Sequence, residues 1–587
     1  MKSPFCLVVA LGFMLFTDSW AQNGPSIPWR VIKDHWSDTD ERGFREFVAG
    51  IGMSRERGEC RTVDQCMKSA GNPWRASDPR RASFWSDCAD LPYLLRAYFA
   101  AKNGLPFSYT GAIRRNSPSS DGSRDIRYVP FGNRVTSRIE VRIEPPRFIP
   151  NALAIIPRIQ ETVSSGKYRM DHTREVSHAL FSDFYPVPVD RDHVQPGTVI
   201  YDPDGHVAVV YKVERNGRVF FIDAHPDNTL SFGEYSSRFD RGWPSHGGGF
   251  LKWRPTQLVN YDRAPDGLFI GGHMVGSTNA ELAREMSLEQ YFGTENTAAL
   301  VDSWRGITGA RGVTLQDLTM GLRRLRGDMS YLFNGSAVAN YHDWVRFRLT
   351  EGDPRFNPVD EMRGQVQSLC NDLQERVNAV QDAINAGIHN QPHPDRLPGN
   401  IYGTSGDWET YSTPSRDARL KTAFQELRLS SERFMGMWRS HDPMLLYAGN
   451  DLAQDILGVF HSESRACTFS YVKSDGVSQA VTLEDLLVSP GEGQPLRLWL
   501  LSFDPYQCPE RRWGASAAEV ASCVDTSGDG AWYGAEQVLR NQIDRTYDVR
   551  MDFNLTELQR LDPARAGVGA AAPPDVDVEA YLLTQSL

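Results

Sequence analysis

Residues 87–106 read DCADLPYLLRAYFAAKNGLP and predict a helix with a cysteine in its first turn. Asp87 is a candidate N-cap, because its carboxylate can accept hydrogen bonds from backbone N–H groups, and Pro92 falls where a missing donor matters little. Gly104, followed by Pro106, is a stop signal. Five apolar residues recur at helical spacing and predict one buried face: Leu91, Leu94, Leu95, Tyr98 and Phe99.

Cys88 would lie at the positive end of this helix. Peptide dipoles there favour a thiolate over a thiol, which suits a nucleophile. Against this interpretation, cysteine is among the most buried residue types, and most cysteines of an exported chain are paired. Asp87 and Asp90 also oppose a thiolate by like charge. The helix alone therefore leaves a nucleophile and a structural cysteine both open.

Composition sets the frame for the rest of the chain. A length of 587 residues predicts two or three domains. The hydrophobic content of 40%, the charged content of 23% and the aromatic content of 11% are typical of globular proteins with real cores. The net charge of −11 lacks the basic footprint of a nucleic-acid-binding protein, so no nucleic-acid partner is expected.

The first 21 residues have the pattern of a secretory signal peptide. Lys2 precedes an apolar run over residues 5–16, and Ser19 and Ala21 offer small residues at the cleavage positions. Cys6 lies inside the run and not at its end, so a lipid-anchored cysteine is not expected. No later segment approaches the ~18 apolar residues of a membrane span. We therefore expect a periplasmic or secreted protein with no transmembrane segment in the mature chain.

The cysteine count singles out one residue. Eight cysteines less Cys6 leave seven, and an odd number in an oxidising compartment leaves one thiol or an intermolecular bridge. Three pairs are expected, the first two closing small loops: Cys60–Cys66, Cys508–Cys523 and Cys370–Cys467. This pairing leaves Cys88 alone.

Residues 196–227 contain three β-rich runs separated by turn sequences, DPDG and then ERNG, and predict a meander whose second strand begins at His206. With a four-residue loop over 214–217, His206 lies opposite His225 and Asp223 is its diagonal neighbour. With a two-residue loop, Asp227 lies opposite His206 instead. In both registers these side chains share one face with His206.

A histidine at a strand start beside a carboxylate or imidazole is an oriented general base. The simpler alternative is a turn histidine, with Asp223 and Asp227 making local turn hydrogen bonds. Cys88 changes this balance, because a nucleophile, a base and an orienting group together make a generalised catalytic triad. His246 lies beside three glycines and is interpreted as a loop histidine.

These residues resemble the papain-like superfamily, especially the bacterial cell-wall amidases and peptidases of the CHAP and NlpC types. The resemblance rests on Asp87-Cys88 at a helix start and on Gly205-His206-Val207 at a strand start. It implies a helix packed on an antiparallel sheet, with Cys88 and His206 catalytic and a polar pair at Asp223 and His225. The ending Gly104-Leu105-Pro106 is similar to transglutaminase-like proteins.

The resemblance covers about residues 80–230. Ala89-Asp90 replaces the small pair that usually follows the cysteine, and the segment between Cys88 and His206 is longer than in compact cell-wall peptidases. These departures bear on the identity of the substrate and on whether the triad is active.

The chain from residue 261 onward is expected to be a mainly helical domain, after a papain-like domain over 22–260. Helices are expected over 279–292 and 315–325. The longest lies over 358–388, where apolar residues step by three and four and predict core packing.

Residues 525–536, DTSGDGAWYGAE, fit a calcium loop. Asp525, Ser527, Asp529 and Glu536 would supply oxygen ligands, with Gly530 at the sharp turn. A plain Asp/Gly turn is the alternative, and the calcium would be structural.

The sequence thus predicts an α+β protein that acts as an exported thiol hydrolase on an amide bond, in peptides of the cell-wall type, with no catalytic cofactor. Three alternatives remain open. They are transglutaminase-like acyl transfer, an inactive binding module on the same scaffold, and a calcium-stabilised surface protein.

Overall fold

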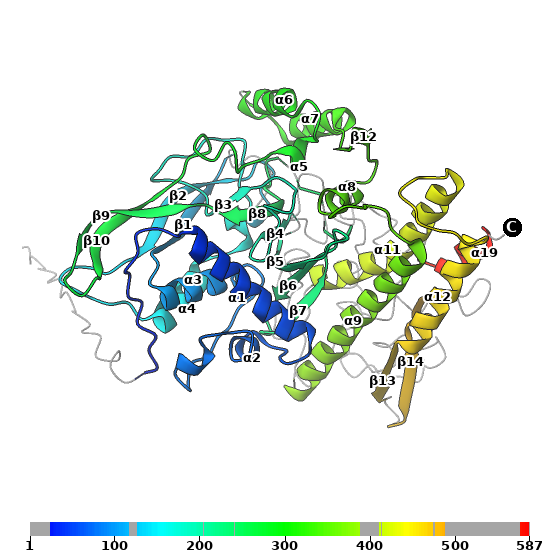
Figure 1. Cartoon of the computed structure of the whole chain (residues 1–587), viewed down its shortest axis with the longest axis horizontal. Coiled ribbons are helices and arrows are strands. Elements are labelled where there is room, and N and C mark those ends of the chain that lie inside the picture. The colour runs from blue at the N-terminus through cyan, green and yellow to red at the C-terminus, as the bar shows by residue number, and fades with distance from the viewer. Residues whose placement is uncertain are drawn as a thin grey trace, which may run out of the picture.

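The computed structural model describes residues 24–116, 126–203, 205–239, 241–242, 244–310, 312–387, 410–411, 414–472, 476–487 and 576–585. At its centre lies a six-stranded antiparallel sheet with the strand order β3-β8-β4-β5-β6-β7 (Figure 1). The strands are β3 (Phe184–Pro186), β4 (Val199–Asp202), β5 (His206–Val213), β6 (Val219–Ala224), β7 (Leu230–Glu234) and β8 (Gly249–Trp253).

One face of the sheet, which we call the α3 face, carries the largest core. Val207 and Val209 of β5 point into this core together with Ile222 of β6. The helices on this side are α1 (Asp38–Glu56), α2 (Val63–Met67), α3 (Leu91–Asn103) and α4 (Ala152–Thr162). We call the sheet with these four helices the sheet unit.

The other face, which we call the α8 face, carries a separate core. Because side chains alternate along a strand, Ala208 and Val210 point to this face, where they join Trp344 of α8 (Tyr341–Arg348). His206 has the same parity as Ala208. The opening histidine of β5 is therefore directed toward α8 and away from α3.

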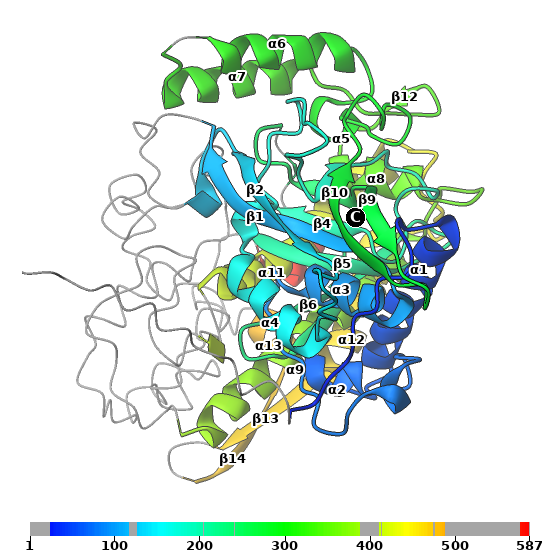
Figure 2. The ribbon, with the colours of Figure 1, turned by 90° about the vertical axis from the view of Figure 1, so that its left-hand side faces the viewer.

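Further elements surround the sheet unit. Two hairpins extend it, β1 (Phe107–Arg115) with β2 (Asn133–Val141) and β9 (Thr256–Arg263) with β10 (Phe269–Gly276). α6 and α7 lie side by side and pack around the buried Trp304 (Figure 2). The remaining short elements are α5 (Glu289–Phe292), α6 (Thr297–Gly309), α7 (Leu315–Asp328), β11 (Leu332–Phe333), β12 (Ser336–Ala337) and the 3₁₀ turns Arg75–Ser77, Ile126–Tyr128 and Ser165–Lys167.

A second group of elements, the helical unit, lies beside the sheet unit and has its own core (Figure 1). The apolar stripe expected over 358–388 is confirmed, because Met362, Val366, Leu369 and Leu373 are buried within this core. Its elements are α9 (Pro358–Asn385), α11 (Pro414–Arg439), α12 (Leu452–Ala466), β13 (Thr468–Val472), β14 (Ser478–Thr482), α13 (Leu483–Leu487) and α19 (Val578–Leu583).

The mixed α and β architecture with antiparallel sheets agrees with the expected class. The expected domain boundary at residue 260 falls inside the β9–β10 hairpin, which contributes Leu258 and Phe269 to the core of the sheet unit. The helix expected over 279–292 is wrong in extent, since only α5 forms there. None of the helices in the described ranges has both the length and the apolar character needed to cross a bilayer.

Candidate functional site

Cys88 lies in a tight turn that leads into α3. Oδ1 of Asp87 accepts hydrogen bonds from the N–H groups of Ala89 at 3.0 Å and Asp90 at 3.1 Å, which closes the turn around the cysteine. α3 then begins at Leu91, whose N–H donates to the Asp87 carbonyl. The expected position in the first helical turn is therefore corrected, since Asp87 caps the preceding turn and not the helix.

The same hydrogen bonds bear on oxyanion stabilisation. Backbone N–H groups near a helix start are a common means of stabilising a developing oxyanion. The N–H groups of Ala89 and Asp90 instead donate to Asp87 in this structure. An oxyanion site there would need other donors or a rearranged Asp87 carboxylate.

Burial changes the charge balance around the thiol. Asp90 is 3% exposed, and burial, reinforced by the charge of Asp87, raises the pKa of Asp90 to about 9. Burial also raises the pKa of Asp87. At neutral pH Asp90 is therefore protonated, and the pair opposes a thiolate at Cys88 less than two full charges would.

Two contacts place the Cys88 turn at one end of the central sheet. The hydroxyl of Tyr168 donates to the carbonyl of Ala89 at 2.6 Å, and its ring stacks on Tyr201 near the end of β4, with the centroids 5.8 Å apart. On the other side, the N–H of Ser86 donates to Oδ1 of Asn228, in the turn between β6 and β7, at 3.2 Å. The half-buried cysteine thus lies near the point where β5 begins and β6 ends.

His206 and Asp223 form a buried pair at this end of the sheet. Nε2 of His206 lies 2.7 Å from Oδ2 of Asp223, and the two residues are 6% and 5% exposed. Because an ionised carboxylate only accepts, it favours the tautomer that carries its proton on Nε2. Nδ1 is then the nitrogen through which the imidazole would accept a proton.

The strand register explains how His225 joins this pair. Val209 pairs with Ile222, and continuing that register places His206 opposite His225, as in the four-residue-loop prediction. Their rings are nearly parallel, with the centroids 6.3 Å apart. The loop itself differs, because Val213 pairs with Val219 and not with residue 218. A β-bulge between residues 210 and 212 compensates for that one-residue shift.

Ser231 is a site residue that the sequence analysis missed. It lies directly opposite Asp223 on β7, where its hydroxyl donates to Oδ1 of Asp223 at 2.6 Å. The same hydroxyl is 2.7 Å from Nε2 of His225. Asp227, in contrast, caps its own turn by accepting from the N–H and hydroxyl of Thr229. That turn fixes the β6–β7 register, and the register places Ser231 opposite Asp223. Recognising the turn in the sequence could therefore have identified Ser231.

The helix that follows Cys88 and the imidazole of His206 lie on different sides of the sheet. α3 packs on the α3 face, whereas His206 and Asp223 point to the α8 face with Phe221 and Phe239. The sequence interpretation expected sulfur and imidazole to meet across one cleft between helix and hairpin. In this fold, contact between Cys88 and His206 would have to be made around the strand ends.

Some of the remaining sequence expectations fall on described residues and others fall outside them. The disulfides Cys60–Cys66 and Cys370–Cys467 are confirmed. His246 lies in a buried turn, where burial holds its pKa well below the usual value. The Cys508–Cys523 pair lies outside the described residues, as does the calcium loop with Asp525, Ser527, Asp529 and Glu536. Within the described ranges, no cluster of three or more His, Cys, Asp or Glu side chains is arranged to hold a metal.

No protein-family model, curated protein or solved structure matches this chain. The likeness to papain-like enzymes therefore rests on the residues at positions 87–88, 205–207, 223 and 225 alone.

Proposed function

We propose that this chain is a thiol hydrolase that cleaves an amide bond, with Cys88 as nucleophile, His206 as proton carrier and Asp223 as the orienting group. The observation that carries the proposal is the buried 2.7 Å contact between Nε2 of His206 and Oδ2 of Asp223. It is supported by the Cys88 turn, which is bonded to the same end of the sheet through Asn228.

In this mechanism Nδ1 of His206 removes the thiol proton, and the sulfur attacks the carbonyl carbon of the scissile amide. The imidazolium is stabilised by Asp223, whose second oxygen is held by Ser231. It then protonates the departing amine nitrogen, which leaves a thioester on Cys88. A water molecule, deprotonated by the same imidazole, hydrolyses the thioester and releases a carboxylic acid.

Peptides of the cell-wall type are the proposed substrates, and the periplasm or the outside of the cell is the proposed location. The two disulfides support an oxidising compartment, since such bonds are rare in reducing ones. The fold contributes a helix-bearing antiparallel sheet of the kind that a papain-like enzyme would need.

The test is the rate of iodoacetamide alkylation of Cys88 against pH, with peptide mapping. We expect the thiol to react well below its ordinary pKa of about 8.5, and we expect His206→Ala to return it to that range. His273→Ala, which removes an exposed imidazole on β10, is the matched control and should leave the profile unchanged.

Unchanged profiles in wild type and His206→Ala would contradict the proposal, because they would show that the thiol does not sense the imidazole. If the two groups are coupled, product analysis on model amides with added amines then separates hydrolysis from acyl transfer. The first yields a free acid and the second a new amide.

A further inference from the structure

The α8 face of the sheet around His206 is covered by the helical unit. A cavity of about 100 Å3 remains beside the imidazole, far smaller than the roughly 300–1,000 Å3 of a typical small-molecule site. Its walls come from both units. The sheet unit supplies His206, Asp223 and His225, and the helical unit supplies Asp372, Glu375, Arg376 and Leu420. A peptide could not reach His206 from this face while α9 stays in place.

Ion pairs hold α9 in this position. Glu375 lies 2.5 Å from Arg55 of α1, and Asp382, two turns further on, lies 2.7 Å from Arg61. Asp372 pairs with the half-buried Arg238, which follows β7. Each of these three acids on α9 therefore meets an arginine from outside the helical unit, along the side of the helix that faces the sheet.

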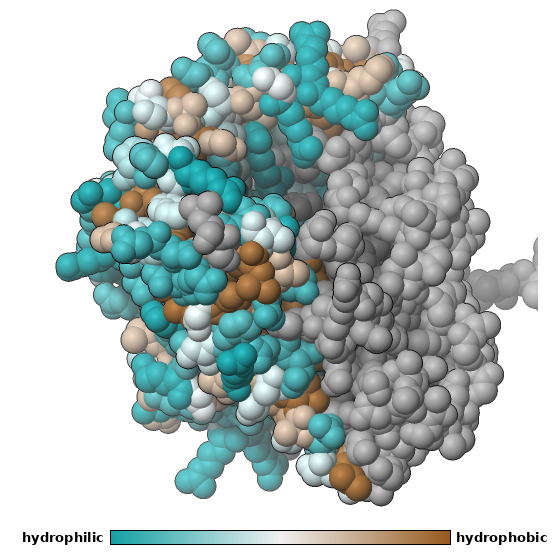
Figure 3. Space-filling view, turned by 90° about the vertical axis from the view of Figure 1, so that its right-hand side faces the viewer, coloured by the Kyte–Doolittle hydropathy of each residue, from teal (hydrophilic) through white to brown (hydrophobic). Residues whose placement is uncertain are grey.

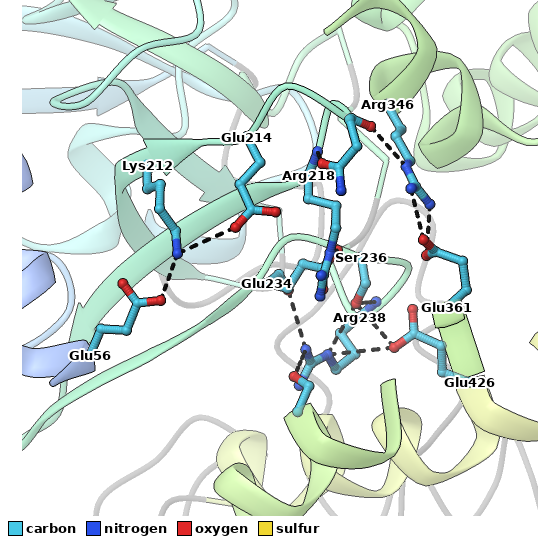
Figure 4. Close-up of polar contacts among 12 residues, drawn as sticks. Glu56, Lys212, Glu214, Arg218, Glu234, Ser236, Arg238, Arg346, Glu361 and Glu426 are labelled. Carbon is cyan, nitrogen blue, oxygen red and sulfur yellow. Dashed lines mark hydrogen bonds and ion pairs between the residues drawn. The ribbon is translucent and has the colours of Figure 1, made fainter. Parts of the chain in front are cut away.

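α11 adds contacts to the same loop after β7. Oε1 of Glu426 accepts from the N–H and the hydroxyl of Ser237, and its other oxygen accepts from the hydroxyl of Ser236 and lies 3.5 Å from Arg238. Figure 4 shows the contacts of Glu426 with Ser236 and Arg238, together with the ion pair between Arg346 of α8 and Glu361 at the start of α9.

The side of α9 that faces the sheet is polar, whereas α8 makes apolar contact by burying Phe347 in the core of the helical unit. The apolar stripe of α9 turns away from the sheet into the core of the helical unit, and the opposite side carries the charges. A further cavity of about 390 Å3 separates the two units near Arg218, Glu234 and Gln365. Polar inter-domain interfaces of this kind permit relative motion by default, and their ion pairs weaken in salt. On the face seen from the right-hand side of Figure 1, hydrophilic residues cover much of the described surface (Figure 3).

We propose that α9 is a built-in lid that closes the His206–Asp223 site, so that the structure is the autoinhibited form of the protein. The proposal rests on the proposed function of His206 and Asp223. Release requires that the ion pairs of Asp372, Glu375 and Asp382 break, after which α9 swings away with the helical unit. The substrate chain would then reach His206 from the α8 face, at the strand ends where Cys88 lies.

The experiment measures access to His206 directly, by the rate of its carbethoxylation with diethyl pyrocarbonate, read by peptide mass spectrometry. The exposed His441 provides the internal reference. In the wild type we expect His206 to react at least roughly tenfold more slowly than His441. In Asp372→Asn/Glu375→Gln the His206 rate should rise about tenfold while that of His441 stays constant.

Asp360→Asn is the matched control, because Asp360 pairs with Arg363 within α9 and makes no contact with the sheet unit in the described structure. It should keep His206 protected. About 1 M salt, where the Debye length falls to about 3 Å, should raise the rate in wild type and add little in the double variant. Hydrogen exchange of α12 reports that the helical unit stays folded.

The lid is overturned if His206 reacts as fast as His441 in the wild type, or if the double variant with an intact α12 leaves its rate unchanged. The same measurements in a Cys88→Ala background separate the two proposals. Protection of His206 and its release depend on α9 and not on the thiol. The alkylation profile of Cys88 therefore tests the hydrolase proposal alone, and the carbethoxylation rate of His206 tests the lid proposal alone.

Discussion

Asp90 carries a carboxyl that burial keeps neutral at neutral pH, and this makes stability depend on pH in a defined direction. An unfolded aspartate loses its proton near pH 4, whereas the pKa of Asp90 in the folded protein is raised to about 9. Between these values the unfolded state binds fewer protons than the folded state. The contribution of Asp90 is therefore fully present below about pH 4 and is lost as the pH rises toward 9.

We accordingly expect Asp90→Asn to stabilise the protein at about pH 8 by roughly 1–3 kcal/mol and to change little at about pH 4. Urea unfolding at the two pH values measures the difference. An equal effect at both values would show that Asp90 is ionised in the folded protein.

Ser231 is a positioning residue for Asp223 and His225. Removing its hydroxyl leaves Oδ1 of Asp223 without a donor that now lies 2.6 Å away. We expect Ser231→Ala to cost about 1–2 kcal/mol of stability and to move the alkylation profile of Cys88 part of the way toward that of Asp223→Asn.

Ser182→Ala provides the comparison for that variant, because it removes another buried hydroxyl, bonded to the Phe184 carbonyl. A similar loss of stability with an unshifted thiol profile is expected there. If Ser231→Ala behaves in the same way, its role is structural only.

At the scale of single residues, the sequence points to the site residues through their side-chain chemistry and through the predicted pairing of the other cysteines. The predicted cysteine pairing draws attention to Cys88, and strand parity brings His206, Asp223 and His225 to one face. Ser231 and the neutral Asp90 are not visible in the same way. A serine on a strand carries no signal until the β6–β7 register is known, and a carboxyl becomes neutral only through burial that tertiary packing creates.

Among the elements, α3 ends where its sequence predicts, at a glycine whose backbone conformation and surroundings disfavour any side chain. Gly104 has φ +67°, and a Cβ there would lie 2.4 Å from Cγ1 of Ile32 and 2.9 Å from the carbonyl oxygen of Arg30. We expect Gly104→Ala to destabilise the sheet unit by at least about 1 kcal/mol, since both strain and clash oppose it.

Gly458→Ala in the middle of α12 gives the opposite expectation. A Cβ there meets nothing within 4 Å, so the higher helix propensity of alanine should stabilise by about 0.5–1 kcal/mol. Chemical unfolding of both variants gives the two signs. If Gly104→Ala stabilised the protein and Gly458→Ala destabilised it, the assignment of Gly104 as the helix end would be contradicted.

Helices with long periodic stripes are predictable, and short elements set by tertiary contacts are not. α9 matches its stripe because burial of one face is encoded every three or four residues. Cys88 falls in a turn and not in α3, since the carboxylate of Asp87 bonds to the N–H groups that would otherwise open the helix. Residues 279–285 likewise form turns and not a helix, although Leu282 is buried in the core of the α8 face.

At the scale of the whole molecule, the sequence marks a change of character near residue 260 but does not locate a boundary. β9 and β10 pair across that point and pack into the sheet unit through Leu258 and Phe269. The sequence also could not predict that α9 covers His206, because the charged side of an amphipathic helix is normally expected to face solvent. Only the folded structure pairs those charges with Arg55, Arg61 and Arg238.

The Cys370–Cys467 disulfide ties α9 to the end of α12 across 97 residues of chain, entirely within the helical unit. A crosslink that closes a loop of this length stabilises the folded state by up to about 4–5 kcal/mol, because it lowers the conformational entropy of the unfolded chain. Because the core on the α3 face of the sheet and the core of the helical unit are separate clusters, we expect Cys370→Ser/Cys467→Ser to weaken hydrogen-exchange protection in α9 and α12 while β5 and β6 keep theirs. A loosened α9 should then also speed carbethoxylation of His206, which links the fold of one unit to access in the other. Loss of protection in all four elements together would instead show one cooperative unit, in which α9 could not move without unfolding the sheet.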